Sequence, residues 1–249
     1  MLLPGGGDWE LVEAGESATS VYRRGLVYAK TCGPTGVAEL VAERDRCEWL
    51  AGTPIPGARV LDWIEGAEGA ALLTSAVPGV AAGDLPWSPA LVSGFAGALR
   101  ALHELPVASC PFERRLDDVV AQAADVVRRG AVNPDFLTDE SRLVAPEELL
   151  ARVLAAAPSV SASLELVVCH GDACLPNFLF DPDTLEWTGM IDLGRLGVAD
   201  RYSDLALAKA QLEDEWSADP AGFFAAYGEA EPDARRLDFY LQLDPLTWG

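Results

Sequence analysis

Two spacings of apolar residues divide the chain into a strand-rich beginning and a helix-rich remainder. Up to about residue 80, short runs of β-branched and aromatic residues alternate with glycine and charged residues, which is typical of hairpins. We predict strands at residues 20–22, 26–30, 59–63 and 70–75. Between the second and third strands, apolar residues recur at helical spacing from Val37 to Leu50, which predicts one helix that ends before Gly52 and Pro54.

From Ser88 onward the pattern is mainly helical. Ser88 and Pro89 form an N-cap followed by proline at the first helical position. We predict helices at residues 88–105, 113–129, 146–156, 202–216, 220–227 and 232–243. A continuous apolar strand at 164–169 and a hairpin, 178–181 with 185–191, interrupt them. The pattern therefore predicts an α+β protein with a β-rich N-terminal lobe at residues 1–78 and a larger helical lobe at 79–249.

The chain is strongly acidic, which bears on its ligands more than on its fold. The 249 residues include 18 Lys plus Arg and 39 Asp plus Glu, a net charge of −21, and 50% are hydrophobic. This composition excludes a disordered acidic tail and argues against nucleic-acid binding. It favours cationic ligands, although acidity can also serve solubility alone. Residues 79–249 carry −16 of this charge and residues 1–78 carry −5.

Targeting and cysteine patterns point to a cytoplasmic protein. We expect no membrane span, because no run of about 18 uncharged apolar residues occurs. The first ten residues lack a basic and then apolar leader, so we expect no secretory signal. Five scattered cysteines form no CxxC pair, which favours reduced thiols over a disulfide framework or a zinc site.

Three oxygen-bearing side chains are expected to converge near the predicted hairpin. Asp172 and Asn177 lie five residues apart in the segment His-Gly-Asp-Ala-Cys-Leu-Pro-Asn, which follows the buried strand. The hairpin leaves from Asn177 and returns to Asp192, so both residues should lie at the same end of it. Hard oxygen ligands in low number suit Mg²⁺ that is also held by substrate phosphates. With Asp172 as the base that accepts a hydroxyl proton, the arrangement fits phosphoryl transfer.

A site for the phosphoryl donor is expected in the N-terminal lobe. Lys30, one of only two lysines in the chain, ends a predicted strand, and Glu43 lies in the helix that follows. A strand lysine oriented by a helix glutamate binds phosphates in kinases. The loop at residues 15–20, which includes Ser17, would cover those phosphates, although it lacks repeated glycine. No GxxxxGK[ST] motif is present, which argues against a P-loop enzyme.

At these residues the chain resembles the aminoglycoside 3′-phosphotransferases, antibiotic kinases related in fold to protein kinases. Two blocks carry the resemblance, Val168–Asn177 and Ile191–Tyr202, and the segment Ala-Leu-His-Glu-Leu-Pro at residues 101–106 also matches. The His-Gly-Asp-x-x-x-x-Asn pattern alone is shared with choline, homoserine and macrolide kinases. The second block is more specific to the 3′ group. His103 is assigned to helix packing.

The resemblance implies a role for each matched residue. Asp172 would be the catalytic base, Asn177 and Asp192 would bind Mg²⁺, and Lys30 with Glu43 would form the ion pair at the ATP phosphates. Ser75 and Val77, in the connector between the lobes, would bind adenine through their backbone. Arg195 would lie near the transferring group or the sugar ring. Four acidic residues would hold the ammonium groups of the drug: Asp139, Glu140, Asp214 and Asp244.

The resemblance predicts an ATP-dependent kinase, a monomer or weak dimer, that phosphorylates the 3′-hydroxyl of kanamycin- or neomycin-like antibiotics. Two departures leave the drug spectrum open. Ala210 and Gln211 occupy the places of an Arg-Asp pair, and the C-terminus after Asp244 differs from the family's Leu-Asp-Glu-Phe-Phe ending. The alternatives are a kinase of the same fold for choline, homoserine or a macrolide, and a relative that binds ligand without turnover.

Overall fold

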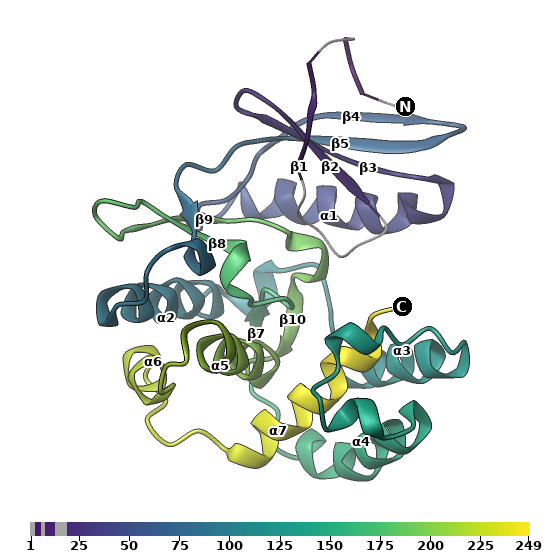
Figure 1. Cartoon of the computed structure of the whole chain (residues 1–249), viewed down its shortest axis with the longest axis vertical. Coiled ribbons are helices and arrows are strands. Elements are labelled where there is room, and N and C mark those ends of the chain that lie inside the picture. Colours follow the sequence, from purple (N-terminus) through teal and green to yellow (C-terminus); the bar gives the residue numbers. More distant parts are fainter. Residues whose placement is uncertain (1–2, 6–7, 13–18) are drawn as a thin grey trace. The chain divides into compact units, whose positions relative to one another are not determined.

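The computed structural model describes residues 3–5, 8–12 and 19–249 (Figure 1). The fold is α+β, as the sequence predicts, with seven α-helices within the described residues. The chain forms two compact units. The N-terminal unit comprises residues 1–85 and 176–195, and the C-terminal unit comprises residues 86–175 and 196–249.

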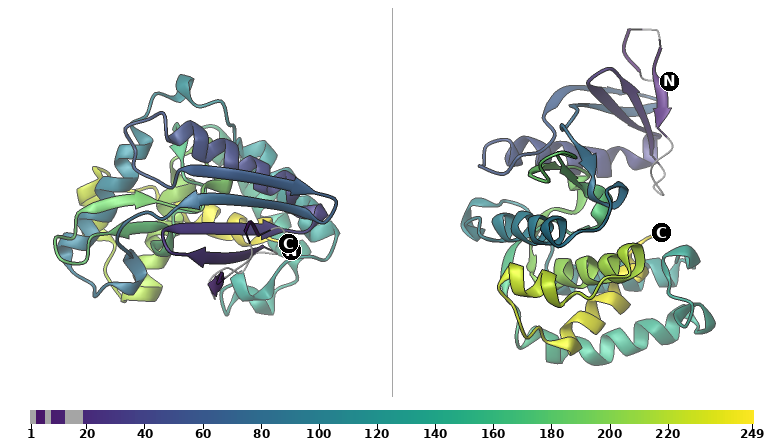
Figure 2. Two further views of the ribbon diagram at one scale, coloured as in Figure 1. Left: turned by 90° about the horizontal axis from the view of Figure 1, so that it is seen from above. Right: turned by 60° about the vertical axis from the view of Figure 1, so that its left-hand side comes forward.

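The N-terminal unit is built on a five-stranded antiparallel sheet with the order β1-β2-β3-β5-β4. Its strands are β1 (Glu10–Val12), β2 (Ser20–Arg24), β3 (Val27–Cys32), β4 (Val60–Gly66) and β5 (Gly69–Ser75). Helix α1 (Val37–Leu50) runs across one face of this sheet (Figures 1 and 2). Buried Leu40 of α1 packs against Cys32, Ala70 and Leu72 of the sheet, so apolar burial fixes α1 beside β3.

A second, three-stranded sheet with the order β6-β8-β9 belongs to the same unit. It consists of β6 (Val80–Ala81), β8 (Phe178–Phe180) and β9 (Trp187–Met190). Gly189 in β9 has φ +154°, and a Cβ there would lie 2.7 Å from Cγ1 of Val77. Only glycine therefore lets β9 approach the connector after β5 this closely.

The C-terminal unit is mainly helical. Its helices are α2 (Pro89–His103), α3 (Leu116–Arg128), α4 (Pro146–Ser161), α5 (Tyr202–Trp216), α6 (Ala221–Tyr227) and α7 (Ala234–Leu243). Strands β7 (Leu166–Cys169) and β10 (Gly197–Asp200) pair antiparallel within this unit. Phe95, Leu99 and Leu102 of α2 are fully buried, and Phe95 contacts Phe223 of α6 at a ring distance of 5.5 Å. No helix in the described part of the chain has the length and apolar character needed to cross a membrane.

The structure corrects two predicted helices and adds three short strands. The helix predicted from residue 113 begins at Leu116, because Glu113 and Arg114 pair with Val198 of β10. The helix predicted to end at residue 156 continues to Ser161 and includes Pro158. Proline in the last turn of a helix removes a single backbone hydrogen bond, which burial of Val160 offsets. Strands β1, β6 and β10 were not predicted.

Candidate active site

Lys30 of β3 lies between two carboxylates. Its Nζ is 2.8 Å from Oε2 of Glu43 on α1 and 2.5 Å from Oδ1 of Asp192, which follows β9. The side chain of Lys30 is 18% exposed and that of Glu43 is 12% exposed. Burial alone would lower the pKa of Lys30, but Glu43 and Asp192 raise it well above its ordinary value. The ammonium therefore stays charged, and it can bind the phosphates of a nucleotide.

The local fold explains why these three side chains meet. Ala29 is fully buried within the sheet, and β-strand alternation places the next residue, Lys30, on the opposite face. Burial raises the pKa of Glu43, and Lys30 opposes that effect as its partner. Asp192 has φ +61°, a left-handed conformation that is uncommon outside glycine and asparagine. Strained backbone of this kind is concentrated at functional sites.

Asn177 and Asp192 lie at the same end of the β8–β9 hairpin, as the sequence predicts. Phe178 pairs with Met190, and the Ile191 N–H donates to the carbonyl of Asn177 at 3.0 Å. Asn177 is 6% exposed, whereas the side chain of Asp192 is 48% exposed. An amide oxygen and a partly exposed carboxylate, both hard donors, are a set that fits Mg²⁺ bound together with phosphates.

The connector after β5 retains one unused backbone donor. The N–H groups of Ser75 and Ala76 donate to the carbonyls of Arg59 and Leu26 at 2.9 and 2.8 Å, so both are engaged within the unit. In the part of the chain that is described, no group accepts a hydrogen bond from the Val77 N–H. Of the two positions predicted to bind adenine, Val77 therefore offers the donor. Ser17, predicted to lie over the phosphates, is outside the described residues.

Asp172 belongs to a tight loop of the C-terminal unit that follows β7. Gly171, just before it, has φ +80°, which a residue with a side chain rarely adopts. The Cys174 thiol donates to Oδ1 of Asp172 at 3.2 Å, and the Cys174 N–H donates to the Asp172 carbonyl at 2.8 Å. Gln211 of α5 accepts from the Leu175 N–H at 3.2 Å. Gln211, one of the two departures from the 3′ pattern, thus supports the loop that carries Asp172.

Sequence reasoning gave Asp204 no role, yet it anchors the start of the same loop. Its fully buried carboxylate accepts the backbone N–H groups of His170 and Gly171 at 2.6 and 2.8 Å. His103 of α2 lies 3.0 Å from its Oδ2 through Nε2. Burial would raise the pKa of Asp204, but the hydrogen bonds from His103 and from the Gly171 N–H hold it below the ordinary value. The one feature of the sequence that could have indicated this role is that Asp204 lies on the apolar side of the predicted helix 202–216.

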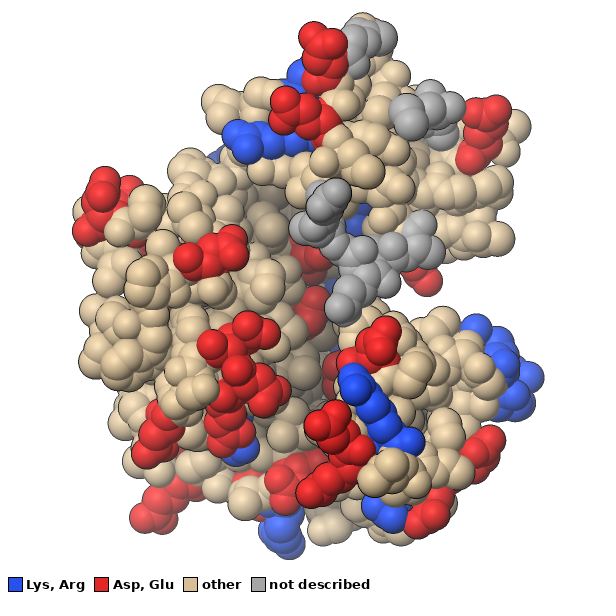
Figure 3. Space-filling model, in the orientation of Figure 1, with Lys and Arg blue, Asp and Glu red and all other residues tan. Residues whose placement is uncertain are grey.

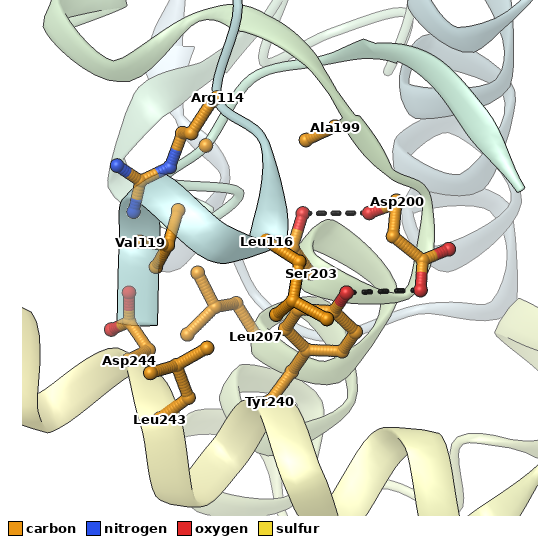
Figure 4. Close-up of a pocket in the computed structure, with 11 residues that line it drawn as sticks. Arg114, Leu116, Val119, Ala199, Asp200, Ser203, Leu207, Tyr240, Leu243 and Asp244 are labelled. Atoms are coloured by element: carbon orange, nitrogen blue, oxygen red, sulfur yellow. Dashed lines mark hydrogen bonds between the residues drawn. The ribbon is translucent and has the colours of Figure 1, made fainter. Parts of the chain in front are cut away.

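Asp244, predicted to bind the drug, lines a small pocket together with Gly171 (Figure 4). In Figure 4, Arg114 and Asp244 lie on one side of the pocket, and Tyr240 donates to Asp200 on the other. The cavity is about 20 Å³, enough for a water molecule and too small for a sugar ring. Asp244 and Gly171, the residue before Asp172, therefore line one small cavity.

The other predicted drug-binding residues are not gathered at this pocket. Asp139 is almost fully exposed, and Arg142 lies 3.5 Å from its carboxylate. Glu140 precedes a short 3₁₀ turn without a capping hydrogen bond from its side chain, and Asp214 is exposed on α5. Arg195 lies in the N-terminal unit, in the turn after Asp192. Acidic side chains gather on the face shown in Figure 3, and basic ones are few there. The roles of these residues stay predictions.

Comparison with known sequences identifies the proteins that this chain resembles. Residues 8–240 match the model of the phosphotransferase enzyme family. A streptomycin 3″-kinase of Streptomyces griseus is 52% identical over 98% of this chain and 94% of its own length. An aminoglycoside 3′-phosphotransferase of Streptomyces fradiae is 42% identical over 95% of this chain and 94% of its own.

Comparison with solved structures agrees with the sequence matches. An aminoglycoside phosphotransferase of Streptomyces rimosus, solved with ADP and streptomycin, superposes with a TM-score of 0.90. The two chains are 49% identical, and the match covers 98% of this chain and 95% of the other. The fold is therefore shared along nearly the whole length, with close to half of the aligned residues identical.

Proposed function

We propose that this chain, which belongs to the phosphotransferase enzyme family, phosphorylates the 3″-hydroxyl of streptomycin. It is an aminoglycoside phosphotransferase and has the kinase-like fold of that group. One observation carries the choice of substrate: identity to the streptomycin 3″-kinase is 52%, against 42% for the 3′-phosphotransferase, and the matches cover 98% and 95% of this chain. The structure solved with ADP and streptomycin supports the same choice.

The residues of the N-terminal unit fit the phosphoryl donor. In this proposal Lys30, held by Glu43, binds the ATP phosphates, and Val77 donates its N–H to adenine. Asn177 and Asp192 hold Mg²⁺, which when bound screens the charge of the phosphates. Asp192 also contacts Lys30 at 2.5 Å, so the carboxylate that would hold Mg²⁺ also orients the lysine.

The residues of the C-terminal unit fit the acceptor. Asp172 orients the attacking hydroxyl and takes its proton as the phosphoryl group is transferred. The Gly171 conformation, the thiol of Cys174 and the carboxylate of Asp204 hold this loop in one shape, which positions the base before the substrate binds. A polycationic drug suits the acidity of residues 79–249, which include 28 acidic and 12 basic residues.

A second candidate is the 3′-hydroxyl of kanamycin- or neomycin-like drugs, which the sequence resemblance predicts. The block Ile191–Tyr202 and the 42% identity to the Streptomyces fradiae enzyme favour it. Ala210 and Gln211 stand against it, because the 3′ pattern has an Arg-Asp pair there. Gln211 supports the catalytic loop with a neutral amide, so the surroundings of Asp172 carry one acidic group fewer than that pattern implies.

The experiment is a substrate panel with purified protein. ADP release would be coupled to NADH oxidation, with Mg-ATP and streptomycin, kanamycin, neomycin or choline as acceptor. We expect kcat/KM for streptomycin to exceed that for kanamycin and neomycin by at least about 10²-fold, with no turnover of choline. A higher kcat/KM for kanamycin or neomycin would replace streptomycin with the second candidate.

The control for this panel is Asp172→Asn, which removes the base and keeps the shape of the side chain. We expect it to lower kcat by about 10³-fold with every accepted substrate. Its circular dichroism and melting temperature should match those of the wild type. Turnover within tenfold of the wild type would show that Asp172 is not the base.

A further inference from the structure

The proposed chemistry leaves His103 without an explanation, although both of its ring nitrogens are engaged. His103 ends α2 and is 6% exposed. Its Nε2 lies 3.0 Å from Oδ2 of Asp204, and its Nδ1 lies 2.7 Å from the hydroxyl oxygen of Tyr227, the last residue of α6. The rings of His103 and Tyr227 meet edge to face. A buried chain of contacts thus runs from α6 through α2 to α5.

The hydrogen-bonding capacity of each group restricts where the protons can lie. Asp204 has a lowered pKa, so it is ionised and only accepts hydrogen bonds. Nε2 of His103 must therefore carry a proton. In a neutral ring Nδ1 is then an acceptor, and the Tyr227 hydroxyl donates to it. Burial raises the pKa of Tyr227 to about 12 against the opposing charge of Arg201, so this hydroxyl keeps its proton.

The other titratable groups around this chain do not compete for Nδ1. Arg201 is paired with Glu165 and Glu229. Burial raises the pKa of Cys169, and its thiol donates to the carbonyl of Asp200 at 3.4 Å. Cys169 with His103 and Asp204 could suggest a metal site. A protonated thiol and a ring with both nitrogens occupied argue against it.

We propose that Tyr227 is a positioning residue for phosphoryl transfer, because its hydroxyl proton holds His103 as the neutral Nε2–H tautomer. In that tautomer His103 donates to Asp204, and Asp204 holds the backbone of His170 and Gly171 immediately before Asp172. The other tautomer would aim the lone pair of Nε2 at the carboxylate and weaken the anchor. The inference rests on the proposed role of Asp172.

The kinetic test compares two tyrosine hydroxyls that are both buried. Tyr227→Phe removes the donor to His103. The matched control, Tyr202→Phe, removes a hydroxyl that accepts the Asp233 N–H at 3.0 Å, outside this chain of contacts. We expect Tyr227→Phe to lower kcat about tenfold while KM for ATP stays within twofold, and Tyr202→Phe to leave both unchanged. Equal kinetics of the two variants would overturn the proposal.

The spectroscopic test needs no substrate, and its result is read from the wild-type protein. The chain has only two histidines, so ¹⁵N-labelled imidazole gives two sets of signals in a long-range ¹H–¹⁵N spectrum. His103→Gln assigns them by loss of one set. We expect His103 at pH 7 as the neutral Nε2–H tautomer. An Nδ1–H tautomer or a doubly protonated ring would overturn the proposal, even if Tyr227→Phe fails to fold. The same spectrum stays valid if the substrate panel rejects streptomycin.

Discussion

At the scale of single residues, the candidate phosphate site depends most on Lys30, in a chain whose only other lysine is Lys209. Lys30 contacts two carboxylates that come from α1 and from the turn after β9, at 2.8 and 2.5 Å. A compact ammonium fits between them, whereas the planar guanidinium of arginine would need a wider gap. The lysine therefore holds Glu43 and Asp192 in place as well as offering its charge to phosphates.

The second lysine provides a matched comparison for this role. Lys209 lies on α5 and pairs with Glu213 one helical turn away, at 2.6 Å. Lys30→Met should lower kcat/KM for ATP about 10²-fold, because a charge aimed at the phosphates is lost. Lys209→Met should change it less than twofold. Steady-state kinetics with ATP as the varied substrate measures both, and equal effects would remove Lys30 from the nucleotide site.

A pH-dependent contribution to stability belongs to Asp204. Its pKa is lower in the folded chain than in the unfolded one, so its stabilisation is present above the ordinary carboxyl pKa of 3.8 and is lost as the pH falls through the folded value. Asp204→Asn should lower the free energy of unfolding at pH 7 by on the order of 3 kcal/mol. The difference in the free energy of unfolding between Asp204→Asn and the wild type should become smaller below about pH 4.

Urea denaturation at a series of pH values measures this prediction. Glu215→Gln, an exposed charge removal on the same helix, should leave the free energy of unfolding within about 0.5 kcal/mol of the wild type at every pH. A constant gap between Asp204→Asn and the wild type from pH 3 to pH 7 would contradict the assigned ionisation.

Which site residues could be predicted follows from how local their signals are. Asp172 and Asn177 lie in one short segment, and Lys30 is conspicuous as one of two lysines. Asp204 was missed, because its partners lie 33 and 34 residues earlier on the catalytic loop and 101 residues earlier on α2. A single sequence does not show which residues come into contact over such separations.

At the scale of secondary-structure elements, local capping signals placed most helices correctly. Ser88 accepts from the Leu91 N–H at 3.2 Å, and Pro89 occupies the first helical position of α2. The hairpin of β8 and β9 was also predicted, from the turn residues between its strands. The short strands β6 and β10 were not, because each forms only by pairing with a distant segment, Phe180 and Leu179 for β6 and β7 for β10.

The cap of α2 gives a prediction at this scale. Ser88→Ala should lower the free energy of unfolding by about 1 kcal/mol, because the Leu91 N–H loses its acceptor. Ser88→Asp, which keeps an acceptor oxygen, should retain most of the wild-type stability. Urea denaturation followed by circular dichroism measures both. Equal losses for the two variants would show that the cap does not stabilise α2.

At the scale of the whole molecule, the charge of −21 is distributed unevenly along the sequence. Residues 79–249 carry −16, and residues 1–78, which include Lys30 and Glu43, carry −5. An acidic surface raises the local concentration of a polycation and lowers that of ATP. The composition could predict that a cationic ligand is favoured, but it could not identify which acidic residues would contact a drug.

Screening by salt tests whether this charge serves binding. KM for the aminoglycoside should rise steeply between low salt and about 0.5 M NaCl, because the Debye length falls below about 10 Å beyond 0.1 M. KM for ATP should stay constant or fall, because repulsion is screened as well. A flat KM for the drug would leave solubility as the role of the charge.

The hydroxyl that receives phosphate tests the central claim most directly. After exhaustive turnover of streptomycin with ATP, a ³¹P–¹H correlation spectrum of the purified product identifies the phosphorylated position. The account predicts a single phosphate coupled to the proton at carbon 3″ and one ADP released for each streptomycin consumed. A phosphate at any other position, or no product from streptomycin while kanamycin is phosphorylated at its 3′-hydroxyl, would contradict it.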